Sequence, residues 1–192
     1  MLPPSVDVAR KVLEVVDVGL CSGLGRPEPG HMCVEAAVCY ALGEPHGAEP
    51  TCVGSAVRAF EISLNDAPWP SNAERAAGMR EVAICQLGSN AINQTAFATE
   101  VALRTVREIL PIALRGIGLE AEASACESAA DLSAAAASAE SAKSASASVA
   151  SAAAASAELS TRVSVLKAAA KIGAETLRKC ACPGVHLWDS IK

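Results

Sequence analysis

The stretch that decides the fold is Cys33-Val34-Glu35-Ala36-Ala37-Val38-Cys39-Tyr40-Ala41-Leu42. Its ten residues carry a single charge, so a helix formed by them is apolar on every face. Such a helix belongs at the centre of a bundle. An isolated carboxylate is too costly to bury, and we therefore expect Glu35 to be paired inside the core or to point into a pocket.

Helix-start signals and Pro/Gly breaks alternate on both sides of this stretch. Ser5 and Thr51 are candidate N-caps, and Ser71 with Glu74 matches a capping box. Pro111 should bend the last helix of the series, because proline has no backbone N–H. The pattern predicts an all-α bundle of about five helices, with approximate bounds Ser5–Cys21, His31–Leu42, Cys52–Leu64, Asn72–Leu87 and Gln94–Arg115.

The composition changes after residue 118, where Ala and Ser dominate up to about residue 179. Ala is the best helix former, so we interpret this segment as a helical arm, an Ala-lined hairpin or a partly disordered linker, in that order. The chain then divides into a bundle domain (1–118) and an Ala/Ser-rich helical arm or hairpin with a C-terminal tail (119–192). Larger apolar residues predict that residues 160–177 pack against the bundle, the Ala-rich helix or a second copy of the chain, so a homo-oligomer through the C-terminal helices is one expectation.

The composition argues against several classes of function. A formal net charge of −5 and a pI near 5.3 give no basic field for nucleic acid. The sequence has no run of about 20 uninterrupted apolar residues, so we expect no membrane span. The first residues form no basic and apolar leader, and several of the eight cysteines lie at apolar helical positions. We therefore expect reduced cysteines and a cytoplasmic protein.

Two segments carry a resemblance to other sequences: PGHMCVEAAVCYALG (residues 29–43) and SNAERAAGMR (residues 71–80). They resemble a group of Ala-rich hypothetical proteins found in bacterial and phage genomes, a group with no established activity. The resemblance implies a bacterial or phage accessory role. It implies nothing about catalysis and transfers no functional residues.

Catalytic and metal-binding patterns in the sequence are incomplete. His31 and Glu35 are four residues apart and share a helical face, which suits acid/base or metal chemistry. A capping histidine and an ion-paired glutamate explain the same spacing, and we prefer that interpretation because no HExxH or CxxC motif accompanies the pair. Cys180, Cys182 and His186 lack a fourth ligand nearby. We expect no metal and no cofactor.

A set of polar residues recurs at the ends of the expected helices. Arg58 and Arg75, together with the exposed amides of a helix that begins at Asn72, could receive a phosphate or another anion. An internal salt-bridge network explains the same residues, and we favour it. The candidate ligand-binding residues are Glu35, His46, Arg58, Asn65, Asp66, Asn72 and Arg75, and Glu61 belongs to the same polar set.

These patterns favour a non-catalytic helical binding protein, because no catalytic set is complete. We expect a bacterial or phage accessory protein that binds a partner protein or sequesters a small anionic, phosphate-bearing ligand. The alternative is a small enzyme that uses Glu35 as general acid/base with His31 or His46 and an arginine anchor.

Overall fold

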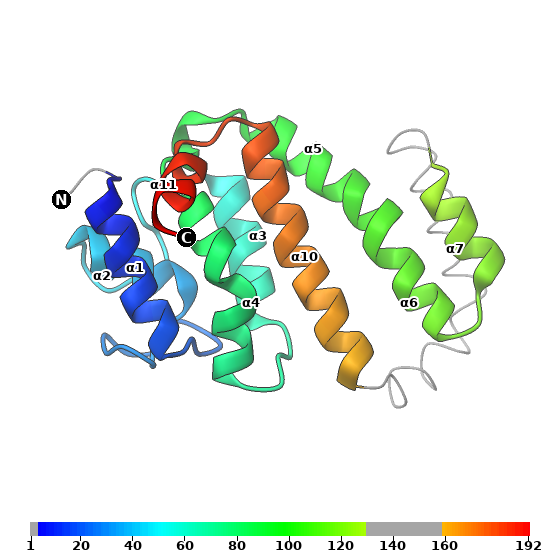
Figure 1. The fold of residues 1–192 in the computed structure, drawn as a ribbon, viewed down its shortest axis with the longest axis horizontal. Coiled ribbons are helices and arrows are strands. Elements are labelled where there is room, and N and C mark those ends of the chain that lie inside the picture. The colour runs from blue at the N-terminus through cyan, green and yellow to red at the C-terminus, as the bar shows by residue number, and fades with distance from the viewer. Residues whose placement is uncertain (1–3, 130–158) are drawn as a thin grey trace.

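Helices form the regular structure of the residues that the computed structural model describes, 4–129 and 159–192, and those residues contain no strand (Figure 1). An isolated β-bridge joins Gly25 to Met32. The all-α class is therefore confirmed. The elements are α1 (Val6–Val18), α2 (Val34–Leu42), α3 (Ser55–Asp66), α4 (Asn72–Cys85), the 3-10 turn η1 (Ser89–Ala91), α5 (Gln94–Arg104), the π-helical turn η2 (Thr105–Ile109), α6 (Leu110–Gly116), α7 (Glu120–Glu127), α10 (Leu159–Lys179) and α11 (Pro183–Ile191).

The apolar helix α2 is buried on nearly all sides, as the sequence predicts. Eight of its nine residues are buried, and the exception is Tyr40, which is 42% exposed. The helix begins at Val34, three residues later than expected, because the residues before it are held in the loop by the bridge at Met32. The side chain of Cys33 caps α2 by accepting a hydrogen bond from the Ala36 amide.

The helix α4 is the one on which the other elements of the bundle converge. It packs against α1, α10 and α11, and Figure 1 shows it between α1 and α10. Its N-terminus is the predicted one, because Ser71 Oγ accepts a hydrogen bond from the Glu74 amide at 3.1 Å. A Cβ atom at Gly78 would lie 2.3 Å from the ring of Trp69, so this position needs glycine for the indole to pack on the helix.

The start of α3 differs from the prediction. Gly54, not Thr51, is the N-cap residue, and the Thr51 side chain instead donates a hydrogen bond to Glu44. A residue from outside the helix caps the first turn of α3, because Gln94 Oε1 accepts a hydrogen bond from the Ala56 amide at 3.1 Å. A Cβ atom at residue 54 would overlap the Gln94 side chain, so the absence of one lets α5 begin beside α3.

The long helix expected between Gln94 and Arg115 contains a π-helical turn. Pro111 lies in the first turn of α6 and has no N–H to offer the carbonyl four residues earlier. The Leu110 N–H bonds to Thr105 O instead, five residues back, and so forms η2. The expected bend at Pro111 thus takes the form of a change of helical register.

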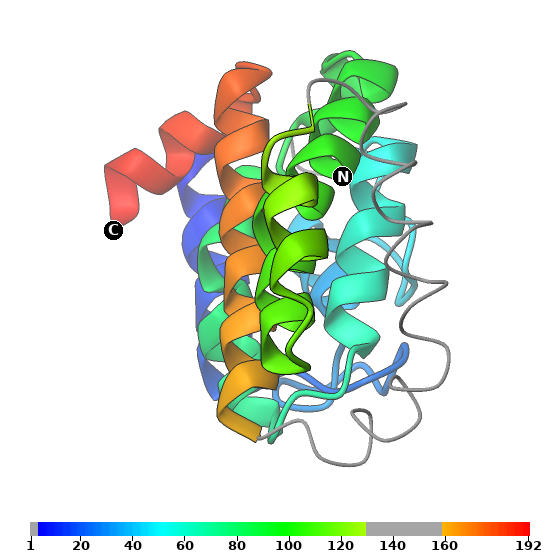
Figure 2. The same ribbon diagram turned by 90° about the vertical axis from the view of Figure 1, so that its right-hand side faces the viewer.

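The helices α10 and α11 return from the C-terminal part of the chain to complete the bundle. In Figure 2, α10 runs lengthwise beside the α5–α6 helix, and it also packs on α4. Leu166, Ala170, Ala174 and Leu177 of α10 and Val185 of α11 belong to the same core cluster as α1, α2 and α4. Of the three expected packing partners of residues 160–177, the bundle is therefore confirmed. The domain boundary at residue 118 remains a prediction.

A second, smaller apolar cluster joins α6 to α7 through Leu114, Ala123 and Cys126. Most of the Ala/Ser-rich segment lies outside the described residues, so its interpretation as an arm, a hairpin or a linker stays a prediction. Within the described part of the chain, no helix has the length and apolar character needed to cross a bilayer.

Candidate ligand-binding site

Arg75 is the centre of the polar cluster predicted between α3 and α4. It lies in the first turn of α4 and is 6% exposed. Its Nε donates to Asn65 O at 2.7 Å, and its Nη1 donates to Leu20 O at 2.9 Å and to Asn72 Oδ1 at 2.7 Å. The guanidinium therefore joins the end of α3, the chain after α1 and the start of α4. Burial lowers the pKa of Arg75.

Asn65 and Asp66 extend this network to the loop that precedes α2. Asn65 Oδ1 accepts a hydrogen bond from the Val34 amide at 3.2 Å, and its Nδ2 donates to Cys21 O at 2.9 Å. Asp66 Oδ1 accepts from the Gly23 amide at 2.7 Å. The structure therefore brings together four of the seven candidate residues, and the hydrogen bonds of their side chains described above go to other groups of the protein. These contacts support the internal network over the anion site, which stays a prediction here.

The other cations and histidines of the predicted set lie near the surface. Arg58 Nη2 is 3.6 Å from Glu49 Oε1, with its side chain 29% exposed. His46 is exposed, and its Nε2 lies 3.2 Å from Gly25 O. His31 is also exposed. Among the described residues, no hydrogen bond or ion pair joins Arg58 or His46 to the Arg75 network.

Glu35 is fully buried, and neither of its carboxylate oxygens has a hydrogen-bond partner or, among the described residues, an ion-pair partner. Of the two expected alternatives, pairing inside the core and pointing into a pocket, this corrects the first. Glu61 on α3 is also fully buried, and none of the four carboxylate oxygens of the two residues has a hydrogen-bond partner. Burial, followed by the charge of Glu61, raises the pKa of Glu35 well above its usual value, and Arg58 opposes this rise. Burial raises the pKa of Glu61 to about 8. Burial therefore favours the neutral acid over the carboxylate at both positions, because a neutral acid is far cheaper to bury.

Two further buried polar side chains were not anticipated from the sequence. Gln86 and Thr176 are fully buried, and neither has a hydrogen-bond partner for its side chain. Gln86 follows an apolar run at the end of α4, and Thr176 lies in the buried face of α10. The only sequence signal for either is an uncharged polar residue within an apolar pattern.

The cavity beneath the loop at residues 44–51 brings a cysteine and a histidine together. Its volume is about 320 Å³, and Cys39, Glu44, His46 and Thr51 line it. Burial raises the pKa of Cys39 to about 12, and the nearby Glu44 carboxylate adds to this rise. A thiol with this pKa is not a thiolate at neutral pH, so the arrangement does not supply an activated nucleophile.

A larger hollow of about 370 Å³ lies where α4, α10 and α11 meet. We call it the α4–α10 groove. Three small residues, Ala77 and Gly78 of α4 and Ala170 of α10, are part of its lining. Its other walls carry the side chains of Arg80, Glu81, Lys167, Lys171 and Trp188.

The cations of the α4–α10 groove differ in how firmly they are held. Arg80 makes a two-point ion pair with Asp17, with Nε–Oδ1 at 2.7 Å and Nη2–Oδ2 at 3.2 Å. Lys167 Nζ is 3.2 Å from Glu74 Oε2, and Lys171 Nζ is 3.8 Å from Glu175 Oε1. The Lys171 side chain is 74% exposed. Exposed pairs at such distances are weak, so both lysines can be recruited by another anion.

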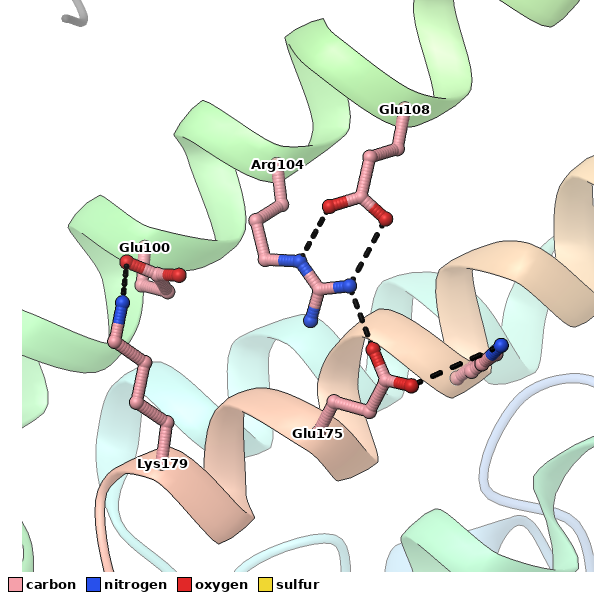
Figure 3. Close-up of polar contacts among 6 residues, drawn as sticks. Glu100, Arg104, Glu108, Glu175 and Lys179 are labelled. Atoms are coloured by element: carbon pink, nitrogen blue, oxygen red, sulfur yellow. Dashed lines mark hydrogen bonds and ion pairs between the residues drawn. The ribbon is translucent and has the colours of Figure 1, made fainter.

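Ion pairs to α5 and η2 also hold α10, the helix that carries these lysines (Figure 3). Arg104, the last residue of α5, donates to Glu108 Oε1 of η2 and to Glu175 Oε2 of α10, each at 2.6 Å, and so joins α5 and η2 to α10. Lys179 Nζ lies 2.8 Å from Glu100 Oε2 one turn further along. The hydrogen bonds from Arg104 lower the pKa of Glu108. The lysine side of the groove is therefore held by α5 and η2 as well as by the core.

Metal ligation finds no ready site in residues 4–129 and 159–192, where no group of three or more His, Cys, Asp or Glu side chains is placed to hold an ion. Of the three residues considered in the tail, Cys182 is buried with its Sγ 3.6 Å from Leu87 O, and His186 is exposed. All eight cysteines lie within the described ranges, and none forms a disulfide.

Comparisons with protein families, curated proteins and solved structures find no match to this chain. The accessory role implied by the sequence resemblance therefore stays a prediction, and the functional argument rests on the geometry of the groove.

Proposed function

We propose that the protein is a non-catalytic binding protein that takes a small anionic ligand in the α4–α10 groove. The observation that carries this proposal is that Arg80 of α4 and Lys167 and Lys171 of α10 line one hollow between the two helices. Glu81 is the one acidic residue of the lining, and its charge is opposed by Arg178 at 3.5 Å. Cations that share a partly enclosed space attract anions more strongly than the same cations spread over a surface.

The location of this site differs from the cluster proposed from the sequence. The donors of Arg75 face carbonyl and side-chain oxygens of the protein itself, whereas the lysines of the groove hold weak, exposed partners. We keep the class of function inferred from the sequence and assign it to the α4–α10 groove instead of the Arg75 cluster.

The enzyme alternative has less support. Glu35, its general acid/base, is 0% exposed, so no substrate reaches it in this conformation. His31 and His46 are both exposed, and neither is bonded to Glu35.

A cytoplasmic location and a bacterial or phage accessory role complete the proposal. The eight unpaired thiols support a reducing compartment. The accessory role rests on the resemblance of residues 29–43 and 71–80 alone.

The test is a calorimetric titration of the full chain with inorganic phosphate and with citrate at low salt. We expect saturable binding with a Kd of about 1 mM or tighter, which corresponds to about −4 kcal/mol. Replacing both lysines, Lys167→Glu and Lys171→Glu, should abolish it, because the groove then becomes acidic.

The matched control is Arg26→Glu, which reverses a charge on an exposed loop outside the groove. It should bind the two anions as the wild type does. Absence of saturable binding, or equal loss in the control, would overturn the proposal.

A further inference from the structure

Trp188 is the feature of the α4–α10 groove that a site for a simple anion does not need. It is half-buried on α11, and the Arg80 guanidinium lies 5.7 Å from the centroid of its ring. The cations alone would serve a phosphate or a carboxylate. A hollow of about 370 Å³ lies in the range of pockets that hold whole small molecules, so there is room for a ligand body beside the anionic group.

The position of Trp188 is fixed by close packing at the start of α11. A Cβ atom at Gly184 would lie 2.3 Å from Ile84 O, so α11 rests directly on the carbonyl end of α4. Val185 is buried in the common core, and Arg178 Nη1 of α10 donates to Asp189 Oδ2 of α11 at 3.1 Å. The ring therefore stands on a well-supported helix, and binding to it requires little ordering of the side chain.

The groove also offers a second flat group. Asp17 holds the Arg80 guanidinium at two points, which fixes its plane near the indole. Indole rings and guanidinium planes both stack on planar ligand groups. Lys167 and Lys171 lie one turn apart on the facing helix, where one anionic group can contact both.

From this arrangement we infer that the ligand of the groove is a planar aromatic anion, with its ring against Trp188 and Arg80 and its phosphate or carboxylate at Lys167 and Lys171. This inference rests on the proposed function and specifies its ligand class. An anion without a ring would use only the lysine end of the groove.

The test compares probes that share an anion and differ in the ring. AMP and 1-naphthyl phosphate carry a phosphate and an aromatic ring, and ribose 5-phosphate carries the phosphate alone. We expect both aromatic probes to bind about tenfold more tightly than ribose 5-phosphate in calorimetric titrations of the full chain, a difference of about 1.4 kcal/mol. Trp188→Leu should reduce this advantage to less than threefold and leave ribose 5-phosphate binding unchanged.

Tyr40→Leu is the matched control, because Tyr40 is a partly exposed aromatic residue with a cation, Lys11, 5.1 Å above its ring and lies outside the groove. This variant should keep the preference for the aromatic probes. Equal affinity for all three probes, or the same loss in both variants, would overturn the aromatic ligand class while leaving the anion site in place. Failure of every probe to bind would overturn both proposals.

Discussion

Glu35 and Glu61 place two carboxylic acids inside an apolar core, on adjacent helices and without hydrogen bonds. At neutral pH the folded protein must keep protons that the unfolded chain releases, because an exposed glutamic acid has a pKa of about 4.5. The protonated form is what makes this burial tolerable. The stability of the protein is therefore linked to pH through these two residues.

We expect Glu61→Gln to stabilise the protein at neutral pH. The pKa of Glu61 is about 8 in the folded protein and 4.5 in the unfolded chain. The stability that comes from binding this proton is therefore fully present below pH 4.5, and the free energy of unfolding falls as the pH rises toward 8. The loss is about 1.4 kcal/mol per pH unit, or about 3 kcal/mol at pH 7, as an upper limit. Glutamine is neutral throughout this range and avoids the loss.

Urea unfolding of the wild type and of Glu61→Gln at pH 5 and pH 8 measures this effect. The difference in unfolding free energy between the two proteins should be small at pH 5 and large at pH 8. Glu14→Gln, the same change at an exposed position of α1, provides the control and should show little difference at either pH. A pH-independent difference for Glu61→Gln would contradict the burial of an uncompensated acid.

At the scale of an element, the attachment of α10 depends on a few large apolar residues among many alanines. Leu177 is fully buried, with an exposed fraction of 0%. We expect Leu177→Ala to destabilise the protein by about 2–5 kcal/mol, because it leaves a cavity between α10 and the core. Denaturant unfolding measures the change.

Val163, in the N-terminal part of the same helix, is only half-buried and serves as the comparison. Val163→Ala should cost about 1 kcal/mol or less. Similar costs for the two substitutions would mean that α10 is not anchored through its C-terminal half.

The elements also show how far local sequence signals determine the helices. The start of α4 was predicted correctly because Ser71 satisfies an amide three residues later, which is a local interaction. The start of α3 was predicted wrongly, because the residue that caps its first turn, Gln94, is far away in the sequence. The π-helical turn η2 follows from Pro111, but a bend and a register change look the same in the sequence.

At the scale of the whole molecule, the packing of α10 and α11 bears on the predicted boundary at residue 118. A chain that ends at this residue lacks both helices and leaves the α4 face with Val82 and Cys85 in water. We expect such a chain to melt without a cooperative transition and to bind a hydrophobic dye such as ANS, as loosely packed states do.

Circular dichroism and dye fluorescence, with the full chain as reference, measure these properties. A cooperative transition near that of the full chain would instead establish residues 1–118 as an independently folding domain.

Sequence patterns identify a candidate site only where its residues are close together in the chain. Asn65, Asp66, Asn72 and Arg75 could be grouped from the sequence because a short turn joins their helices. The residues of the α4–α10 groove could not be grouped from the sequence. Arg80 and Lys171 are about 90 residues apart, and only the tertiary packing of α10 on α4 brings them together. The sequence also could not show that Glu35 is buried without a hydrogen-bond partner, because a paired and an unpaired glutamate fit the same pattern.

The return of the last two helices to α4 has a consequence during synthesis. Roughly 100 residues separate Cys85 from Val185, and at roughly 5–20 residues per second a ribosome needs roughly 5–20 s to make them. Throughout that interval the apolar face of α4 emerges without its cover and is open to chaperones and to other nascent chains. The truncated chain that ends at residue 118 presents this same surface, so its affinity for dye also reports how exposed the growing protein is before its final helices arrive.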